Sequence, residues 1–255
     1  MKQIIIDTDP GIDDTMAIYF ALNSPELEVI GLTTVYGNTS NIQGTENALR
    51  ILEIANKKGI PVHTGASKPL MTQYLGKGEI VHGIDGQGNS NLIKPKIKEG
   101  EISAINFMKN KIDEFPGEIT LVPIGPLTNI AQLLTEYPGI DKKIKEIVLM
   151  GGNALSQGNA SPAAEANIKN DPEAANHVFR SNTKITMVGL DVTNQVFMDK
   201  LTIKEISNHG SDQTNHLKVI LPHYVDFLSR FYSKQGMPIH DSSAIAFLIN
   251  SELFK

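Results

Sequence analysis

The sequence has 255 residues and contains neither cysteine nor tryptophan. The absence of cysteine excludes disulfide bonds and thiolate metal sites, and it is compatible with a reducing compartment. No uninterrupted apolar run reaches the roughly 18 residues that a membrane-spanning helix needs. The N-terminal residues "MKQIIIDTD" reach charged side chains too soon for a signal peptide. We therefore expect a soluble, cytoplasmic protein with no membrane partner.

A concentration of positive charge is also missing. Lysine and arginine are scattered, and the formal net charge is −5. Without a basic stripe to follow a phosphate backbone, a nucleic acid polymer is not the expected partner, and we expect a small-molecule ligand. The chain is 40% apolar and long enough to bury a substantial core, and no linker, repeat or low-complexity tract divides it.

Apolar, β-branched runs alternate along the chain with segments of helical period. The predicted strands are residues 3–7, 27–36, 61–65, 118–124, 145–150 and 184–190. The predicted helices between them are residues 13–22, 41–57, 102–112, 127–137 and 172–180. This alternation predicts an α/β fold, Rossmann-like, with a mostly parallel central sheet and helices on both faces. After Val192 the sequence predicts a helical C-terminal portion.

Residues 75–91, "LGKGEIVHGIDGQGNSN", interrupt this pattern with five glycines. Such a composition disfavours regular structure and is typical of a mobile loop, so this segment is a candidate lid.

Unusual polar clusters follow directly on four of the predicted strands. They are "DTDPGIDD" after the first strand, "YGN" after the second, "GPLTN" after the fourth and "GGN" after the fifth. Parallel sheets bind ligands beyond the carboxyl ends of their strands, so we expect these clusters to converge on one rim.

The first cluster places Asp7, Asp9, Asp13 and Asp14 within eight residues. Either Asp13 or Asp14 alone could be an ordinary helix cap. Four neighbouring carboxylates repel each other, however, and the usual relief is a raised pKa or a bound cation. Oxygen ligands without cysteine or a histidine pair favour Ca²⁺ or Mg²⁺ over zinc. Asp241, itself a possible cap, could close the site together with a backbone carbonyl from "PIGPLTN".

Two further groups of side chains are candidates for reading a sugar and for proton transfer. Residues 150–175 are rich in asparagine and carry Glu165, and such side chains read hydroxyl groups, although asparagine is also common in loops. His82 and His240 are the candidate proton donors for a reaction near neutral pH. His223, Phe227 and Phe231 repeat at helical spacing, which favours a core stripe over the lining of a ligand pocket.

Seven motifs follow one another along the chain: "DTDPGIDD", "VYGN", "VHGIDG", "LVPIGPLTNIA", "VLMGGN", "AEANIKNDPEAA" and "PIHDSSAIAFL". Taken in this order, they resemble those of the nucleoside hydrolases, the inosine-uridine preferring nucleoside N-ribohydrolases. The resemblance implies calcium-dependent hydrolysis of the N-glycosidic bond of ribonucleosides to ribose and free base, a role in nucleoside salvage, and a homodimer or homotetramer. Family members generally continue past the segment "NSELFK". The resemblance therefore implies a single domain, residues 1–255, that lacks the family's C-terminal extension.

The resemblance also implies roles for individual residues. Calcium would be held by the side chains of Asp9, Asp14 and Asp241 and by the backbone carbonyl of Ile124. Asp9 would also be the base that deprotonates the attacking water, while Asp7 orients the other carboxylates. The residues that match ribose contacts are Asp13, Asn38, Asn159, Glu165 and Asn167. His82 and His240 match positions beside the nucleobase, with His240 protonating the leaving group.

The expected chemistry is consistent with these side chains. Cleavage of an N-ribosyl bond passes through an oxocarbenium-like state, which nearby carboxylates stabilise. We expect attack on C1′ from the face opposite the base, with inversion. The absence of tryptophan argues against the purine-specific branch, and His240 before Asp241 resembles the pyrimidine-preferring or nonspecific branch.

Two alternatives stay open at the level of sequence. "DTD" after an apolar strand superficially matches the nucleophile motif of haloacid dehalogenase-type phosphatases. A nucleoside-binding protein without turnover would use the same ligand contacts and produce no reducing sugar.

Overall fold

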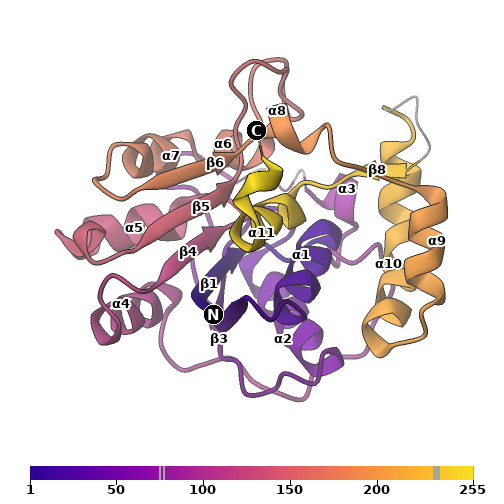
Figure 1. The fold of residues 1–255 in the computed structure, drawn as a ribbon, viewed down its shortest axis with the longest axis horizontal. Helices are drawn as coiled ribbons and strands as arrows, with labels where there is room; N and C mark the ends of the chain where they lie inside the picture. The colour runs from indigo at the N-terminus through magenta and orange to yellow at the C-terminus, as the bar shows by residue number, and fades with distance from the viewer. Residues whose placement is uncertain (75, 77, 232–235, 255) are drawn as a thin grey trace.

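The computed structural model describes residues 1–74, 76, 78–231 and 236–254. Its centre is a six-stranded parallel sheet in the order β3-β2-β1-β4-β5-β6 (Figure 1). The strands are β1 (Lys2–Thr8), β2 (Leu27–Thr34), β3 (Val62–Thr64), β4 (Thr120–Pro123), β5 (Glu146–Met150) and β6 (Ile185–Val188). The order reverses between β1 and β4, which is where doubly wound sheets bind their ligands.

The central strand β1 is buried on both faces. Ile4, Ile5 and Ile6 are fully buried, as expected for an inner strand of a parallel sheet with helices on either side. In the parallel register, Asp7 lies opposite Thr33 of β2 and Pro123 of β4. The first aspartate of the acidic cluster therefore enters from the middle of the sheet.

Alternate residues of the strands feed two separate cores. Ile4 and Ile6 belong to the core on one face, and Ile5 belongs to the core on the other, because successive strand side chains point to opposite faces. The first face is covered by α1 (Ile12–Leu22), α2 (Asn41–Ile54), α10 (Asp212–Leu228) and α11 (Asp241–Ile249). The second is covered by α4 (Ala104–Glu114), α5 (Thr128–Glu136) and α7 (Pro172–Phe179). The predicted α/β fold with helices on both faces is confirmed.

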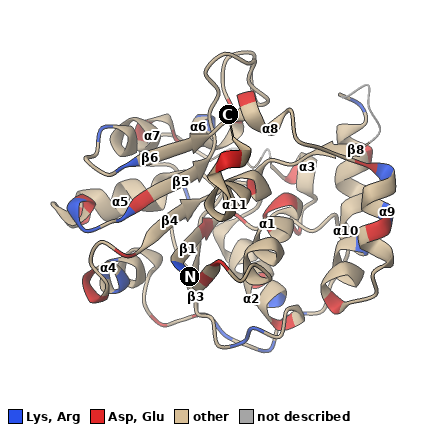
Figure 2. Ribbon diagram, in the orientation of Figure 1, with Lys and Arg blue, Asp and Glu red and all other residues tan. Residues whose placement is uncertain are grey.

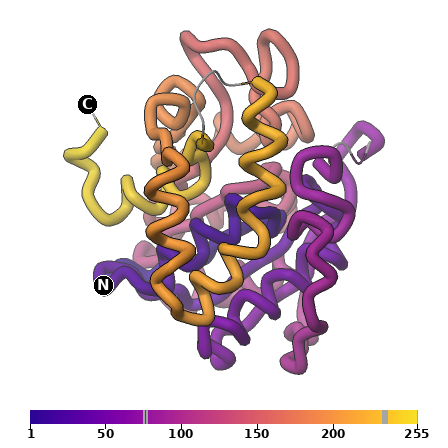
Figure 3. The backbone as a smooth tube through the Cα atoms, turned by 90° about the vertical axis from the view of Figure 1, so that its right-hand side faces the viewer, coloured from indigo at the N-terminus to yellow at the C-terminus, as the bar shows by residue number. Residues whose placement is uncertain are grey.

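The C-terminal portion is mostly helical, as predicted. It contains α8 (Leu190–Thr193), α9 (Lys200–Asn208), α10, α11 and the 3₁₀ turn η2 (Ser251–Leu253). Figure 3 shows α9 and α10 side by side along one side of the molecule. Two strands of three residues, β7 (Phe197–Asp199) and β8 (Gly236–Pro238), pair in an antiparallel sheet that the sequence pattern did not predict. Strand β8 leads directly into His240 and α11.

The glycine-rich segment 75–91 contains more regular structure than predicted. Leu75 and Lys77 lie outside the described residues, but residues 79–82 form the short helix α3 (Glu79–His82). The segment is tied to its surroundings, because Asn47 Nδ2 donates to the carbonyl of Asp85 and Gln87 Nε2 donates to the carbonyl of Gly11. The expectation of irregular structure is wrong for α3, and a lid function stays a prediction.

The distribution of charge matches the composition. Figure 2 shows Lys and Arg spread over outer helices and loops rather than gathered in one band. None of the helices in the described part of the chain has the length and apolar character needed to cross a bilayer.

The packing of α4 on the sheet predicts an effect of enlarging Gly31. A Cβ atom at Gly31 in β2 would lie 2.3 Å from the ring Cζ of Phe107 in α4, so Gly31→Ala overpacks the second core. We expect its free energy of unfolding to fall by about 1–3 kcal/mol in urea denaturation. Gly59→Ala is the matched control, because no atom lies within 4 Å of a Cβ there. Equal effects of the two substitutions would contradict the packing argument.

Candidate active site

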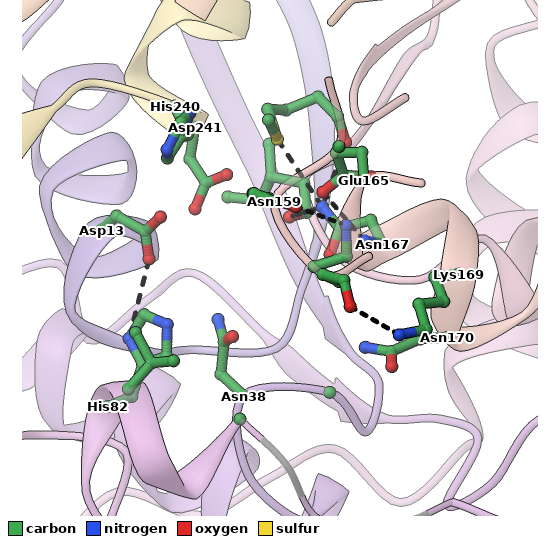
Figure 4. A pocket seen from close by; sticks show the side chains of 18 of the residues that line it. Asp13, Asn38, His82, Asn159, Glu165, Asn167, Lys169, Asn170, His240 and Asp241 are labelled. Carbon is green, nitrogen blue, oxygen red and sulfur yellow. Dashed lines mark hydrogen bonds and ion pairs between the residues drawn. The ribbon is translucent and has the colours of Figure 1, made fainter. Parts of the chain in front are cut away.

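A cavity of about 850 Å³ lies over the carboxyl ends of the strands. Most of the sequence-predicted site residues line it, namely Asp13, Asn38, His82, Ile124, Asn159, Glu165, Asn167, His240 and Asp241. The other two, Asp9 and Asp14, are buried in its floor, with 1% and 0% of their surfaces exposed. Figure 4 shows the carboxylates of Asp13 and Asp241 next to each other, with Asn159, Glu165 and Asn167 across the cavity from them.

Asp14 is held rigidly at the start of α1. Its Oδ1 accepts a hydrogen bond from the hydroxyl of Thr8 (2.5 Å), and its Oδ2 accepts from the backbone N–H of Gly11 (3.0 Å) and from Asn38 Nδ2 (2.8 Å). Asp14 therefore serves as a helix cap, as the simpler interpretation expected, and it also faces the other carboxylates.

Asp9 is enclosed by two glycines. A Cβ atom at Gly37 would lie 2.0 Å from Asp9 Oδ2, and one at Gly125 would lie 2.6 Å from Asp9 Oδ1. Oδ2 accepts from the backbone N–H of Asn38 (2.7 Å), whereas buried Oδ1 has no hydrogen-bond partner among the described residues. The glycines at the ends of β2 and β4 thus leave room for a carboxylate with one unsatisfied oxygen.

Asp13 contacts the aromatic wall of the cavity. Its Oδ2 accepts from the hydroxyl of Tyr224 (3.3 Å), and its Oδ1 lies 3.8 Å from His82 Nδ1. That contact is not an ion pair, because His82 Nδ1 accepts the backbone N–H of Ile12 (3.1 Å) and burial lowers the pKa of His82 to about 4. His82 is thus neutral at pH 7 with its proton on Nε2, and its ring stacks on Tyr224.

The clustered carboxylates form a credible site for a hard cation. One oxygen each from Asp13, Asp14 and Asp241 lies within 4.8 Å of the others. No lysine or arginine of the described chain forms an ion pair with them. The closest set therefore contains Asp13 in addition to Asp14 and Asp241, which are two of the three predicted side-chain ligands, whereas the third, Asp9, lies outside this set. The donors are all oxygens, which suits a hard divalent cation.

Burial and mutual repulsion raise the pKa values of these acids. The pKa of Asp9 lies well above its usual range, first because of burial and second because of the charge of Asp14. Burial and the charge of Asp13 raise the pKa of Asp14, and they raise that of Asp241 well above its usual range. For Asp13 itself, burial raises the pKa to about 6. In the absence of a cation each of these groups is therefore harder to ionise in the folded protein than in the unfolded chain.

Asp7 lies behind the cluster and makes no contact with the cavity. Its Oδ1 accepts from the hydroxyl of Thr33 (2.6 Å) and from Asn129 Nδ2 (2.7 Å), while Oδ2 is buried without a partner among the described residues. Its backbone carbonyl accepts the N–H of Ile124 (2.8 Å), which fixes the turn that presents the Ile124 carbonyl. Asn129 was not singled out in the sequence beyond its place in "GPLTN".

The asparagine-rich segment after β5 forms another wall of the cavity. Glu165 is buried and accepts three backbone N–H groups, from Gly152, Asn167 and Ile168. Asn167 Nδ2 donates to the carbonyls of Ile124 (3.0 Å) and Met150 (3.1 Å), so it bridges the ends of β4 and β5. Asn159 Oδ1 accepts the N–H of Ala166, and Lys169 Nζ donates to Ala160 (Figure 4).

The remaining end of the cavity is aromatic and apolar. Tyr224, Phe227 and Phe231 line it, so this helical face contributes to the pocket, whereas His223 is not among the lining residues. His240 Nδ1 lies 2.8 Å from the hydroxyl of Thr193, and burial lowers the pKa of His240 to about 4. The sequence pattern missed Tyr224 and Thr193, since a tyrosine in an amphipathic helix and a threonine in a short turn carry no distinctive signal.

Comparisons with known proteins identify the family that this chain resembles over its length. Residues 4–255 match the family model of the inosine-uridine preferring nucleoside hydrolases. The chain is 40% identical over 253 residues to uridine nucleosidase 1 of Arabidopsis thaliana, covering 99% of this chain and 75% of that protein. It is 39% identical over 256 residues to the pyrimidine-specific ribonucleoside hydrolase RihA of Salmonella arizonae, covering 98% and 80%. The solved purine-preferring ribonucleoside hydrolase from Gardnerella vaginalis matches with a TM-score of 0.95 and 34% identity, covering 100% and 82%.

The raised pKa of Asp7 predicts a pH-dependent difference in stability. Burial raises this pKa from 3.8 to about 7, so the folded state binds a proton that the unfolded state has released. This stabilising contribution is complete below pH 4 and is lost as pH rises through about 7. Between pH 5.5 and 8, the free energy of unfolding of the wild type should fall by about 1–2 kcal/mol relative to Asp7→Asn, measured in urea with chelator.

Asp141→Asn is the matched control for this measurement. The side-chain hydrogen bond from Asn182 lowers the pKa of Asp141, so Asp141 does not titrate in this range. Parallel pH profiles for the wild type and Asp7→Asn would contradict the assignment.

Proposed function

The chain belongs to the inosine-uridine preferring nucleoside hydrolase family and is an N-glycosyl hydrolase of ribonucleosides, and we propose that its activity depends on calcium and favours pyrimidine nucleosides or lacks base preference. Membership of this family sets aside both alternatives from the sequence, the phosphatase and the binding protein without turnover. The observation that supports the proposal best is the group of buried carboxylates with an unsatisfied oxygen beside a cavity large enough for a nucleoside.

We propose that Asp9, Asp14, Asp241 and the carbonyl of Ile124 hold the cation. The carbonyl of Ile124 already accepts one hydrogen bond from Asn167, and its second lone pair suffices for a cation. Asp13, within the same group of oxygens, faces the ribose side. When bound, Ca²⁺ supplies positive charge that offsets the repulsion among these acids and lowers the pKa of a neighbouring water.

Asp9 is the proposed proton acceptor for the attacking water. Its Oδ2 accepts the N–H of Asn38 and keeps a second lone pair for the cation, while Oδ1 has no partner in the described structure and is available for a proton. A carboxylate in hydrogen-bond reach of the water removes its proton as the bond to C1′ forms.

The ribose contacts are proposed for Asp13, Asn38, Asn159, Glu165 and Asn167, all of which line the cavity. Their oxygens and amides suit hydroxyl groups, and the carboxylates favour the positive charge that develops on the ring as the base leaves. Attack from the face opposite the base inverts the anomeric centre.

The nucleobase is proposed to occupy the end of the cavity lined by His82, Tyr224, Phe227 and His240. Both histidines are neutral at pH 7 because burial lowers their pKa values, so each can donate an N–H without carrying a full charge. We propose that His240 donates to the departing base. The proposed preference for pyrimidine nucleosides is supported by the names of two similar proteins, uridine nucleosidase 1 and the pyrimidine-specific hydrolase RihA. The purine-preferring hydrolase has the same fold, so the fold alone does not determine which base is preferred.

A homodimer or homotetramer, a cytoplasmic location and a role in nucleoside salvage stay predictions from the family resemblance. Size-exclusion chromatography with light scattering measures the first of these directly.

Removal of the cation is expected to abolish activity and reduce stability. In a reducing-sugar assay with uridine, cytidine, inosine and adenosine, chelator should reduce hydrolysis at least about a hundredfold, and added Ca²⁺ should restore it. Ca²⁺ should also raise the melting temperature more at pH 8 than at pH 6, since protons compete for the same oxygens at lower pH. Full activity in chelator, with no thermal shift, would overturn the calcium proposal.

Asp9→Asn tests the proposed base. The amide keeps the shape and can still accept the N–H of Asn38, but it cannot take a proton, so kcat should fall by about 10²–10⁴. Nucleoside binding, measured by calorimetry with Ca²⁺ present, should change far less. A kcat within threefold of the wild type would exclude Asp9 as the acceptor.

A further inference from the structure

The short helix α8 contacts two segments of the chain near the cavity. At its C-terminal end Thr193 contacts His240, and at its N-terminal end the N–H of Leu190 donates to the carbonyl of Gly152 (2.9 Å). Between these contacts, Asp191 points toward the loop that follows β5. The helix therefore touches both the base end and the loop that carries Asn159.

Asp191 binds three successive backbone N–H groups of that loop. Its Oδ2 accepts from Ala154 (2.7 Å), and its Oδ1 accepts from Leu155 (2.7 Å) and Ser156 (2.8 Å). Charge-assisted hydrogen bonds of this length are stronger than neutral ones. Three on one carboxylate fix both the position and the direction of the loop's first turn.

The loop spans residues 153–165, and after residue 156 it is held mainly by its own hydrogen bonds. Gly158 donates to the carbonyl of Pro162, and Ala160 donates to that of Ala164. Apolar burial adds little at the first turn, because the side chain of Leu155 is 97% exposed. Lys169 anchors the far side of the loop through Ala160, so Asp191 is the polar anchor of the near side.

The anchored loop contributes directly to the cavity. Gln157, Gly158, Asn159 and Ala160 line it, immediately after the three residues that Asp191 binds. Asp191 itself does not line the cavity and would touch neither substrate nor cation. Neither the sequence motifs nor the assigned ribose residues include it.

We propose that Asp191 is a positioning residue that holds the loop of residues 153–160 in the conformation that binds ribose. The inference rests on the proposed function, in which Asn159 contacts ribose. Without the carboxylate, the loop must be ordered at the moment of binding, and the cost of ordering it reduces affinity for the sugar. The same cost applies whatever base is attached, so base preference should not change.

The test compares Asp191→Ala and Asp191→Asn with the wild type, each with Ca²⁺ present. Inhibition by free ribose and by free uracil separates the sugar end from the base end. For Asp191→Ala we expect KM for uridine and inosine and Ki for ribose to rise about tenfold, while Ki for uracil changes less than twofold. Asp191→Asn keeps one acceptor oxygen and should give a smaller rise. The ratio of kcat/KM between uridine and inosine should stay within twofold of the wild-type ratio.

Asp141→Ala is the matched control. Like Asp191, Asp141 is an acidic residue that accepts a backbone N–H from a loop residue, Asn182. Neither Asp141 nor Asn182 lines the cavity. It should leave KM and both inhibition constants unchanged. Hydrogen exchange at residues 154–156 should accelerate in Asp191→Ala only, which shows that the anchor has been released in a folded protein.

The outcomes separate the two levels of inference. A wild type that releases no ribose from any nucleoside would overturn the proposed function. An active wild type whose Asp191→Ala variant shows faster exchange at 154–156 but an unchanged Ki for ribose would overturn the positioning role alone. A base-dependent change, or an equal effect of Asp141→Ala, would also overturn it.

Discussion

The repulsion among buried carboxylates at the end of β1 is the constraint on which the site depends. Asp9, Asp13, Asp14 and Asp241 are brought together without a paired lysine or arginine in the described chain, and burial raises the pKa of each. Such a group is costly unless protons or a cation neutralise it. Hydrogen bonds from backbone and neutral side chains hold the acids in place without neutralising them, which leaves their charge for a ligand.

The fold supplies this arrangement by bringing distant parts of the chain to one rim. The sheet order reverses between β1 and β4, so the loops after these two strands diverge and leave a crevice between them. Helix α11 packs against α1, which brings Asp241 opposite Asp13 although 228 residues separate them in the sequence. Gly37 and Gly125 let the neighbouring strand ends approach Asp9 more closely than any side chain would permit.

Much of this could be predicted from the sequence, and the limits have physical causes. The long buried strands and amphipathic helices carry strong periodic signals, and the polar clusters after the strands had to share one edge once the sheet was parallel. Strands β7 and β8 were missed because three residues carry no measurable period. Helix α3 was missed because its glycine-rich flanks disfavour a helix, while tertiary hydrogen bonds hold the segment. Thr193, Tyr224 and Asp191 depend on contacts between remote segments, which no local pattern encodes.

The cavity divides its chemistry by charge. The floor beneath the proposed ribose side is rich in carboxylates, while the histidines at the proposed base end are neutral, because burial raises the pKa values of the acids and lowers those of the histidines. This division matches the charge changes of N-glycosidic cleavage, in which the sugar becomes more positive and the departing base more negative. Neutral N–H donors stabilise the base only as negative charge develops, and they place no cation beside the sugar. Differential stabilisation of this kind lowers the barrier without tightening the binding of the substrate itself. In the proposed mechanism, the acidic floor and the neutral base end thus act on the two fragments of the same breaking bond.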